Sequence, residues 1–234
     1  MASRLFVALD VEQESVASDL AIRLAPYGVR FKIGLEWFCR FGPAGVERLR
    51  PLTGPVLLDL KLHDIPRTVA AAVAAIRPLG VWGVTLHSSG GPAMLRAAVA
   101  AADGAMRCLG VTVLTSIAAR DLGAVGWLGS VADQVQRLAS LARDSGCDGV
   151  VASAQEAAML RAALGPEHLV VTPGVRLAGA GADDQARRST PGEAIAAGAD
   201  FLVVGRPIVA APDPEGALRR VLVDMAAVSS ADRR

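Results

Sequence analysis

The residues best suited to chemistry lie in one short segment, DLKLHDIPRT, at residues 59–68. Side chains alternate between the two faces of a strand, so Asp59, Lys61 and His63 share one face and the intervening leucines take the other. Opposite charges inside a protein are costly unless they are paired and hydrogen-bonded. The pair of Asp59 and Lys61 therefore indicates a reactive site, and a purely stabilising buried ion pair is the alternative.

Lysine usage points to the same segment. The chain has 24 lysines and arginines, and only Lys32 and Lys61 are lysines. A guanidinium does not give up a proton near neutral pH, so these two positions indicate a need for the compact ammonium, unless both lysines remain by chance on a solvated face. Lys32, in FKIG, and Asp64, just past the strand, can reach the same cluster. Alternating lysines and aspartates would fix each other's protonation states and hold Lys61 as a proton donor.

Two histidines, His63 and His87, raise the question of a metal site together with Asp59 and Asp64. No set of three ligands with recognisable spacing accompanies them. Hydrogen-bonded loop histidines are the favoured interpretation, and no metal is predicted.

A second group of residues is suited to binding an anion. Arg206, in VVGRPI, follows the last strand-like run, where barrels often bind phosphate. The long segment 176–191, RLAGAGADDQARRSTP, is a candidate lid that carries further polar side chains: Arg176, Gln185, Arg187 and Arg188. For Arg187 and Arg188, a solvated loop is an equally good interpretation.

The elements that must position these residues are short apolar runs typical of strands. They alternate with longer segments of helical spacing along the whole chain. The expected strands are Leu5–Leu9, Arg30–Ile33, Val56–Leu62, Gly83–His87, Cys108–Leu114, Gly149–Ala152, Leu169–Thr172 and Phe201–Val204. The expected helices include Glu14–Leu24, Thr68–Ile76, Met94–Ala102, Val131–Arg143, Gln155–Leu164, Pro191–Ala197 and Glu215–Met225.

This alternation predicts an α/β fold, a single (β/α)8 TIM barrel that forms one domain over residues 1–234. An open doubly wound sheet is the alternative, but ALDVEQE follows the first strand where that fold has a glycine-rich GxGxxG turn. In a barrel, the reactive residues gather at the carboxyl ends of the strands.

Composition excludes several other classes of protein. The net charge is +1 and aromatic residues make up 4% of the 234 residues, so neither a phosphate backbone nor stacked bases are suitable partners, and no nucleic acid is expected. The three cysteines, Cys39, Cys108 and Cys147, form no pattern typical of disulfides or metal sites, which fits a cytoplasmic protein. The apolar run 69–76 is far too short to cross a membrane.

These residues resemble the signature of the orotidine 5′-phosphate decarboxylase family. Besides DLKLHDIPRT, the matching pieces follow the order of that family: ALD ending at Asp10, FKIG, LHSSGG at 86–91, VTVLTS at 111–116, TPGVR at 172–176, DDQARRSTP at 183–191 and VVGRPI at 203–208. The resemblance implies a cofactor-free carboxy-lyase that converts orotidine 5′-monophosphate to UMP, the last step of pyrimidine biosynthesis.

The resemblance also implies roles for particular residues. Lys61 would protonate C6 of the pyrimidine, with Asp59 next to the departing carboxylate and Lys32 and Asp10 at the ribose hydroxyls. Thr115 or Ser116 would contact the base, and the phosphate would lie against Arg176, Gln185, Gly205 and Arg206. Asp64, Ile65 and Thr68 would reach into the site of a partner subunit, so the expected assembly is a homodimer.

Two other functions remain as alternatives. The DxKxxD core of Asp59, Lys61 and Asp64 is shared with relatives that act on sugar phosphates, so a magnesium-dependent decarboxylase or aldolase is one of them. The other is a nucleotide-binding module without activity, which would have little use for a buried array of lysines and aspartates.

Overall fold

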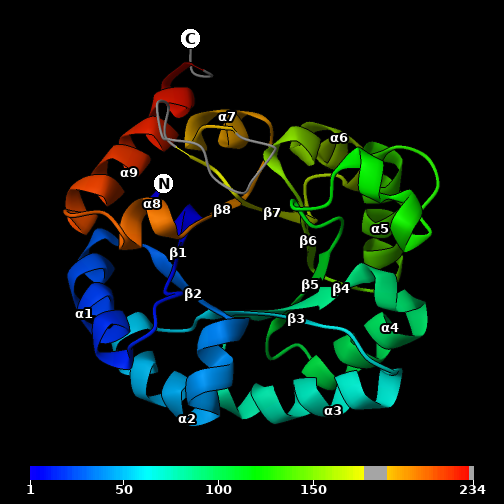
Figure 1. Cartoon of the computed structure of the whole chain (residues 1–234), viewed down its shortest axis with the longest axis horizontal. Coiled ribbons are helices and arrows are strands. Elements are labelled where there is room, and N and C mark those ends of the chain that lie inside the picture. Colours follow the sequence, from blue (N-terminus) through cyan, green and yellow to red (C-terminus); the bar gives the residue numbers. More distant parts are fainter. Residues whose placement is uncertain (177–188, 232–234) are drawn as a thin grey trace.

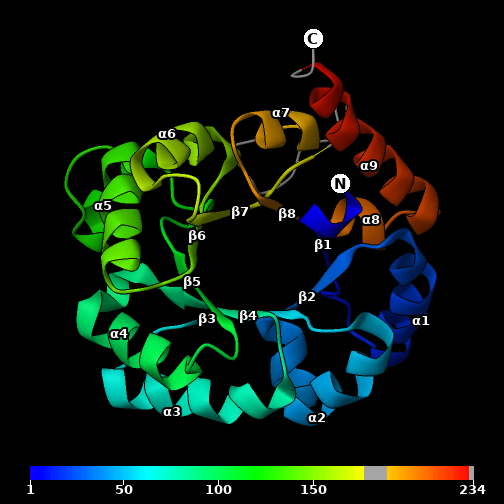
Figure 2. The same ribbon diagram turned by 180° about the vertical axis from the view of Figure 1, so that it is seen from behind.

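Eight parallel strands close into a barrel in the order in which they occur along the chain, from β1 to β8. The computed structural model describes residues 1–176 and 189–231. Figures 1 and 2 show the strands around the centre and the helices in an outer ring. The strands are β1 (Leu5–Ala8), β2 (Arg30–Gly34), β3 (Leu57–Leu62), β4 (Gly83–His87), β5 (Arg107–Val111), β6 (Gly149–Val151), β7 (Leu169–Pro173) and β8 (Phe201–Val204). The predicted (β/α)8 barrel is therefore confirmed.

The helices of the outer ring follow the strands in alternation. They are α1 (Glu14–Leu24), α2 (Leu35–Thr53), α3 (Pro66–Ile76), α4 (Gly91–Ala102), α5 (Val131–Asp144), α6 (Ala154–Leu164), α7 (Pro191–Ala196), α8 (Arg206–Val209) and α9 (Pro214–Ala231). The sequence pattern predicts no helix over α2, which is kinked at Gly42, where φ is +59°. Gly42 and Pro43 together interrupt the helical pattern in the sequence, although the chain is helical on both sides of the kink.

The strands contribute to two different cores, one between the strands and the helices and one inside the barrel. On β3, Leu58 and Leu60 pack outward against the helices, while Leu57 belongs to the cluster inside the barrel. The expected alternation of the leucines with the charged residues is therefore correct along this part of β3. On β5, however, the strand ends at Val111 rather than Leu114. Thr112, the next residue, bonds the carbonyl of Val151 through both its N–H and its hydroxyl.

Aromatic side chains fill the interior of the barrel at the amino ends of the strands. The ring of Phe6 lies 4.9 Å from that of Trp82 and 5.4 Å from that of Phe201. The guanidinium groups of Arg30 and Arg107 cover Trp82 from outside, at 5.8 Å and 4.8 Å from its ring centre. Side chains therefore fill the interior of the barrel at this end, and the space inside the barrel opens at the carboxyl ends of the strands.

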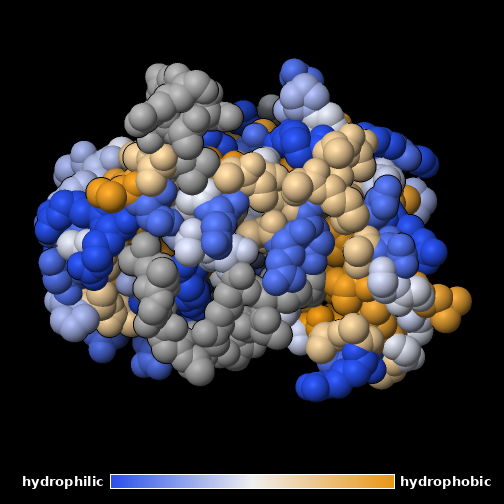
Figure 3. Space-filling view, turned by 90° about the horizontal axis from the view of Figure 1, so that it is seen from above, coloured by the Kyte–Doolittle hydropathy of each residue, from blue (hydrophilic) through white to orange (hydrophobic). Residues whose placement is uncertain are grey.

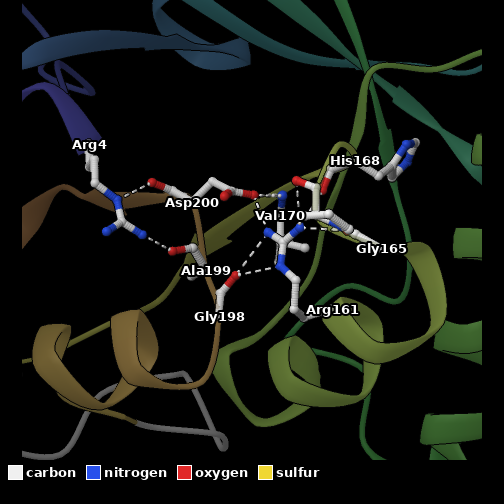
Figure 4. Close-up of polar contacts among 9 residues, drawn as sticks. Arg4, Arg161, Gly165, His168, Val170, Gly198, Ala199 and Asp200 are labelled. Atoms are coloured by element: carbon white, nitrogen blue, oxygen red, sulfur yellow. Dashed lines mark hydrogen bonds and ion pairs between the residues drawn. The ribbon is translucent and has the colours of Figure 1, made fainter. Parts of the chain in front are cut away.

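Arg161 ties together the connections below strands β7 and β8 (Figure 4). Its guanidinium donates to the carbonyl oxygens of Gly165, Pro166, His168 and Gly198. It also pairs with the carboxylate of Asp200, which accepts a hydrogen bond from the backbone N–H of Val170. Arg4 binds the carbonyl oxygens of Ala199 and Asp200 from the other side. One side chain of α6 thereby fixes the loops α6–β7 and α7–β8 at the end of the barrel opposite the charged residues.

Exposed apolar residues fall into separate regions of the surface. Seen from above, hydrophobic side chains gather toward the side on which α5 and α6 lie in Figure 1 (Figure 3). Val125 and Leu128, between β5 and α5, are 52% and 78% exposed. Leu35 begins α2 and Ile65 precedes α3, on another side of the ring, and they are 53% and 61% exposed. Over the residues that the structure describes, no helix is long and apolar enough to span a bilayer.

Candidate active site

A cavity of about 440 Å³ opens at the carboxyl ends of the strands. Its polar and charged wall is made by residues from almost every strand end: Asp10, Lys32, Glu36, Asp59, Lys61, Thr85, Thr115, Arg176 and Arg206. Apolar residues such as Leu57, Val111, Val171 and Val203 form its floor. This distribution of polar groups over an apolar floor is typical of a site for a small organic ligand.

Four charged side chains form a continuous chain along one wall of the cavity. The ammonium of Lys32 lies 2.8 Å from Oδ2 of Asp10 and 3.5 Å from Oδ2 of Asp59. Lys61 contributes the next contact, with its Nζ 2.7 Å from Oδ1 of Asp59. Strands β1, β2 and β3 are neighbours in the barrel, which brings these charges together. The sequence pattern placed Lys32, Asp59 and Lys61 in one cluster together with Asp64. The structure brings the first three together, but Asp10 is the fourth member of the chain of contacts, and Asp64 is exposed and does not line the cavity.

The carboxylate of Asp59 is held in its ionised form. Burial alone would raise its pKa, but attraction to Lys32 and Lys61 and hydrogen bonds from Lys61 and Thr85 outweigh burial, so the pKa lies below its ordinary value. Lys32 is itself almost completely buried, with 5% of its surface exposed. Each cation is therefore matched by a carboxylate, as a buried array of charges requires.

Strand β3 is irregular at Lys61. Leu58 pairs with Val84 and Leu62 pairs with Leu86, so two more residues lie on β3 than on β4 between these pairs. Lys61 has a φ of +50°, which non-glycine residues rarely adopt. A bulge of this kind redirects a side chain near an active site, and here it turns the ammonium of Lys61 toward Asp59.

Asp10 is anchored by the backbone of the next strand. The N–H of Gly34 donates to Oδ1 of Asp10 over 3.0 Å. A Cβ atom at position 34 would lie 2.3 Å from that oxygen and 2.9 Å from the ammonium of Lys32. Only glycine therefore leaves room for the ion pair of Asp10 and Lys32.

The opposite wall of the cavity carries the anion-binding candidates. Arg176 follows β7, and Gly205 and Arg206 follow β8, and all three line the cavity. Thr115 also lines it, whereas Ser116 is not among its lining residues. Gln185, Arg187 and Arg188 lie outside the described residues. The two arginines add positive charge to the part of the cavity wall that follows β7 and β8.

The residues expected to serve a partner subunit lie outside this cavity. Asp64, Ile65 and Thr68 are exposed, and none of them lines it. Oδ1 of Asp64 accepts the backbone N–H of Ile65 over 2.6 Å. These three side chains are therefore available on the outside of the protomer.

The shared face expected for His63 is wrong. Its ring packs against that of His87 at 5.5 Å between centres, and neither histidine lines the cavity. The bulge at Lys61 is the physical reason, because it breaks the alternation of the strand before residue 63 is reached. Burial, with repulsion from His63 and Lys61, lowers the pKa of His87. In the described part of the chain, no three histidine, cysteine or acidic side chains are grouped as a metal site would need.

Sequence reasoning missed Thr85, which contacts both members of the central pair. Its hydroxyl lies 3.0 Å from Oδ1 of Asp59 and 2.9 Å from the backbone nitrogen of Lys61. A neutral side chain within the apolar run of β4 gives no signal of its own. Its position on the inward face of that strand is the feature that would have identified it.

A closed parallel barrel with a charged cavity at the carboxyl ends of its strands is the architecture of a (β/α)8-barrel enzyme. Residues 3–221 match the Orotidine 5′-phosphate decarboxylase / HUMPS family, and the chain belongs to that family.

Individual relatives agree with this membership. The chain is 51% identical over 227 residues to the orotidine 5′-phosphate decarboxylase of Halorhodospira halophila, covering 96% of each chain. It is 49% identical over 226 residues to the enzyme of the same name from Thermobifida fusca, covering 96% of this chain and 97% of that one. The crystal structure of orotidine 5′-phosphate decarboxylase from Lactobacillus acidophilus superimposes with a TM-score of 0.81 at 34% identity, covering 94% of this chain and 97% of that one.

Proposed function

We propose that this protein decarboxylates orotidine 5′-monophosphate to UMP, a carboxy-lyase reaction that completes pyrimidine nucleotide synthesis in the cytoplasm. The observation that carries the proposal is the contact of 2.7 Å between Lys61 and Asp59 inside a cavity of matching size, in a chain that belongs to the family. A positioned ammonium next to a carboxylate supplies both a proton and a fixed field for the reaction.

In the proposed reaction, the bond between C6 and the carboxyl carbon breaks, and its electron pair stays on C6 as CO₂ leaves. The ammonium of Lys61 stabilises this charge and gives its proton to C6, and the neutral amine then regains a proton from water. Asp59 lies next to the departing carboxylate, so its charge disfavours the bound substrate more than the transition state. No cofactor takes part, because Lys61 provides the positive charge.

The rest of the substrate is bound by both walls of the cavity. Asp10 and Lys32 hold the ribose hydroxyls, and Thr115 contacts the base, a choice over Ser116 that the cavity lining supports. The phosphate lies against Arg176, Gln185, Gly205 and Arg206. Because the phosphate is remote from C6, its binding energy orients the base for reaction.

We further propose a homodimer in which Asp64, Ile65 and Thr68 complete the site of the partner. The exposure of all three residues supports this arrangement. Leu35 directly follows β2, and Ile65 lies three residues after the end of the neighbouring strand β3. Both are large and more than half exposed, and they supply apolar surface for an interface.

The test is the absorbance of orotidine 5′-monophosphate on addition of the purified protein, with CO₂ release measured in parallel. We expect the absorbance to fall with or without EDTA. Loss of activity in EDTA and its return with Mg²⁺ would assign the chain to the sugar-phosphate relatives. Binding of UMP without turnover would identify a nucleotide-binding module and overturn the proposal.

A further inference from the structure

Thr85 lies opposite the bulge of β3, in the middle of β4. Between the paired positions of Leu58 with Val84 and Leu62 with Leu86, β4 has this single residue where β3 has three. Only 1% of its surface is exposed, and it borders the cavity. A bulge leaves backbone groups of the longer strand without their ladder partners, so something else must satisfy them.

The hydroxyl of Thr85 satisfies both sides of the bulge. The backbone N–H of Lys61 can only donate, so the hydroxyl oxygen accepts from it, over 2.9 Å. The ionised carboxylate of Asp59 can only accept, so the hydroxyl proton points to its Oδ1, over 3.0 Å. These two partners fix the direction of the hydroxyl, and one atom thereby links the backbone of Lys61 to the side chain of Asp59.

This link determines which oxygen of Asp59 faces which lysine. Oδ1 receives the hydroxyl of Thr85 and the ammonium of Lys61, while Oδ2 is left toward Lys32 at 3.5 Å. Without the hydroxyl, only the two lysines hold the orientation of the carboxylate about its Cβ–Cγ bond. The backbone of Lys61, held at a φ of +50°, also loses its hydrogen-bond partner at that point.

We propose that Thr85 is a positioning residue for the proton transfer, holding Asp59 and the backbone of Lys61 in the arrangement that directs the ammonium of Lys61 at the reacting carbon. The inference rests on the proposed function and adds to it a residue that acts through the two charged groups. Misplacement of a catalytic group by about 1 Å can lower a rate about a hundredfold.

Thr112 provides a matched control. It is also 1% exposed, and its hydroxyl makes one hydrogen bond, 3.0 Å long, to the carbonyl of Val151. It does not line the cavity. Thr112→Val therefore removes a buried threonine hydroxyl of similar structural value without touching Asp59 or Lys61.

The experiment compares Thr85→Val, Thr85→Ser and Thr112→Val by kcat, KM and the Kd for UMP. We expect Thr85→Val to lower kcat about 10- to 100-fold while KM and the Kd for UMP change less than about threefold, because ligand binding does not use the rotation of Asp59. Thr85→Ser keeps the hydroxyl and restores kcat to within about threefold of the wild type. Thr112→Val leaves kcat within the same range.

Several results would overturn the inference. One is a kcat of Thr85→Val within threefold of the wild type. Another is a loss of kcat in Thr112→Val equal to that in Thr85→Val. The third is a parallel loss of UMP affinity in Thr85→Val, which would mark general damage to the site. If Thr85→Val does not fold, Thr85→Ala, which lacks the second branch, is measured against the same limits, and failure of both to fold assigns Thr85 a purely structural role. A wild-type protein without activity contradicts the proposed function itself, which separates that failure from this one.

Discussion

At the scale of single residues, the site depends on a lysine that is positioned by its neighbours. Lys61 contacts Asp59 at 2.7 Å, and the carboxylate of Asp59 also lies 3.5 Å from the ammonium of Lys32. Each ammonium is a compact charge with protons to give, whereas the guanidinium used for the other 22 basic positions is planar and keeps its protons. The chemistry proposed for Lys61 therefore cannot be taken over by the larger cation.

Lys61→Arg should be nearly as inactive as Lys61→Ala. Arginine preserves the charge but is too weak an acid to protonate C6, and loss of a general acid lowers a rate by roughly a hundredfold or more. Steady-state turnover of orotidine 5′-monophosphate by both variants checks this expectation. Turnover by Lys61→Arg above about a hundredth of the wild-type rate would contradict the role of Lys61 as proton donor.

His168 should make the folded protein sensitive to acid. Burial, with repulsion from Arg143 and Arg161, lowers the pKa of His168 in the folded state below its ordinary value of 6.5. The unfolded chain therefore binds the proton more tightly. The folded state therefore keeps its full stability, as far as His168 is concerned, above about pH 6.5. It loses stability as the pH falls toward the lowered pKa.

Replacing His168 by Gln should therefore flatten the pH dependence of the free energy of unfolding as the pH falls below about 6.5. Urea unfolding at several pH values measures this dependence. If the free energy of unfolding falls equally steeply with falling pH in the wild type and in His168→Gln, groups other than His168 determine the loss of stability in acid.

At the scale of elements, the side chain of Arg161 holds together the loops α6–β7 and α7–β8 at the amino end of the barrel. Arg161→Ala should lower the free energy of unfolding by about 1.5–3 kcal/mol, the range for hydrogen bonds that involve a charged group. Arg161→Lys should recover little of this loss, because an ammonium cannot span Asp200 and the carbonyls of both loops at once. Urea denaturation gives the stabilities, and KM should stay constant in both variants, since Arg161 lies at the end of the barrel away from the cavity. A stability for Arg161→Lys equal to that of the wild type would contradict this account.

The sequence predicts most elements and most of the charged site, for different reasons. The alternating apolar pattern gives α1, β4 and β8 with the bounds observed, because each lies between clear turn residues. It gives no helix over α2, because Gly42 and Pro43 interrupt the pattern while packing keeps the chain helical. Residue type alone identifies Lys61 and its carboxylate neighbours. The bulge of β3 and the contacts of Thr85 depend on the register between two strands, which no local pattern contains.

At the scale of the whole molecule, the exposed loop after β3 bears on how many chains make one site. Asp64 and Ile65 point outside the cavity of their own protomer, next to strand residues that lie within it. A twofold interface brings the same loop of each chain to the other, so every such contact occurs twice.

Mixing the inactive variants Lys61→Ala and Asp64→Ala should restore activity in the proposed dimer. In a mixed dimer, one site carries both substitutions and the other carries neither. Random exchange makes half of the dimers mixed, so about a quarter of all sites should be intact. Activity is measured after reversible dissociation, with exchange followed by a size-tagged subunit. Proven exchange without recovered activity would mean that Asp64 serves its own chain.

The distribution of the site around the barrel has a consequence for how such a protein can change over generations. The lysine and aspartate chain comes from β1 to β3, while Arg176 and Arg206 follow β7 and β8. In the proposed complex, the first group contacts the reacting carbon and the ribose, and the second holds the phosphate. A substitution in one group leaves the other intact, so descendant proteins can acquire a new reaction on a phosphorylated compound while they keep the same phosphate-binding site.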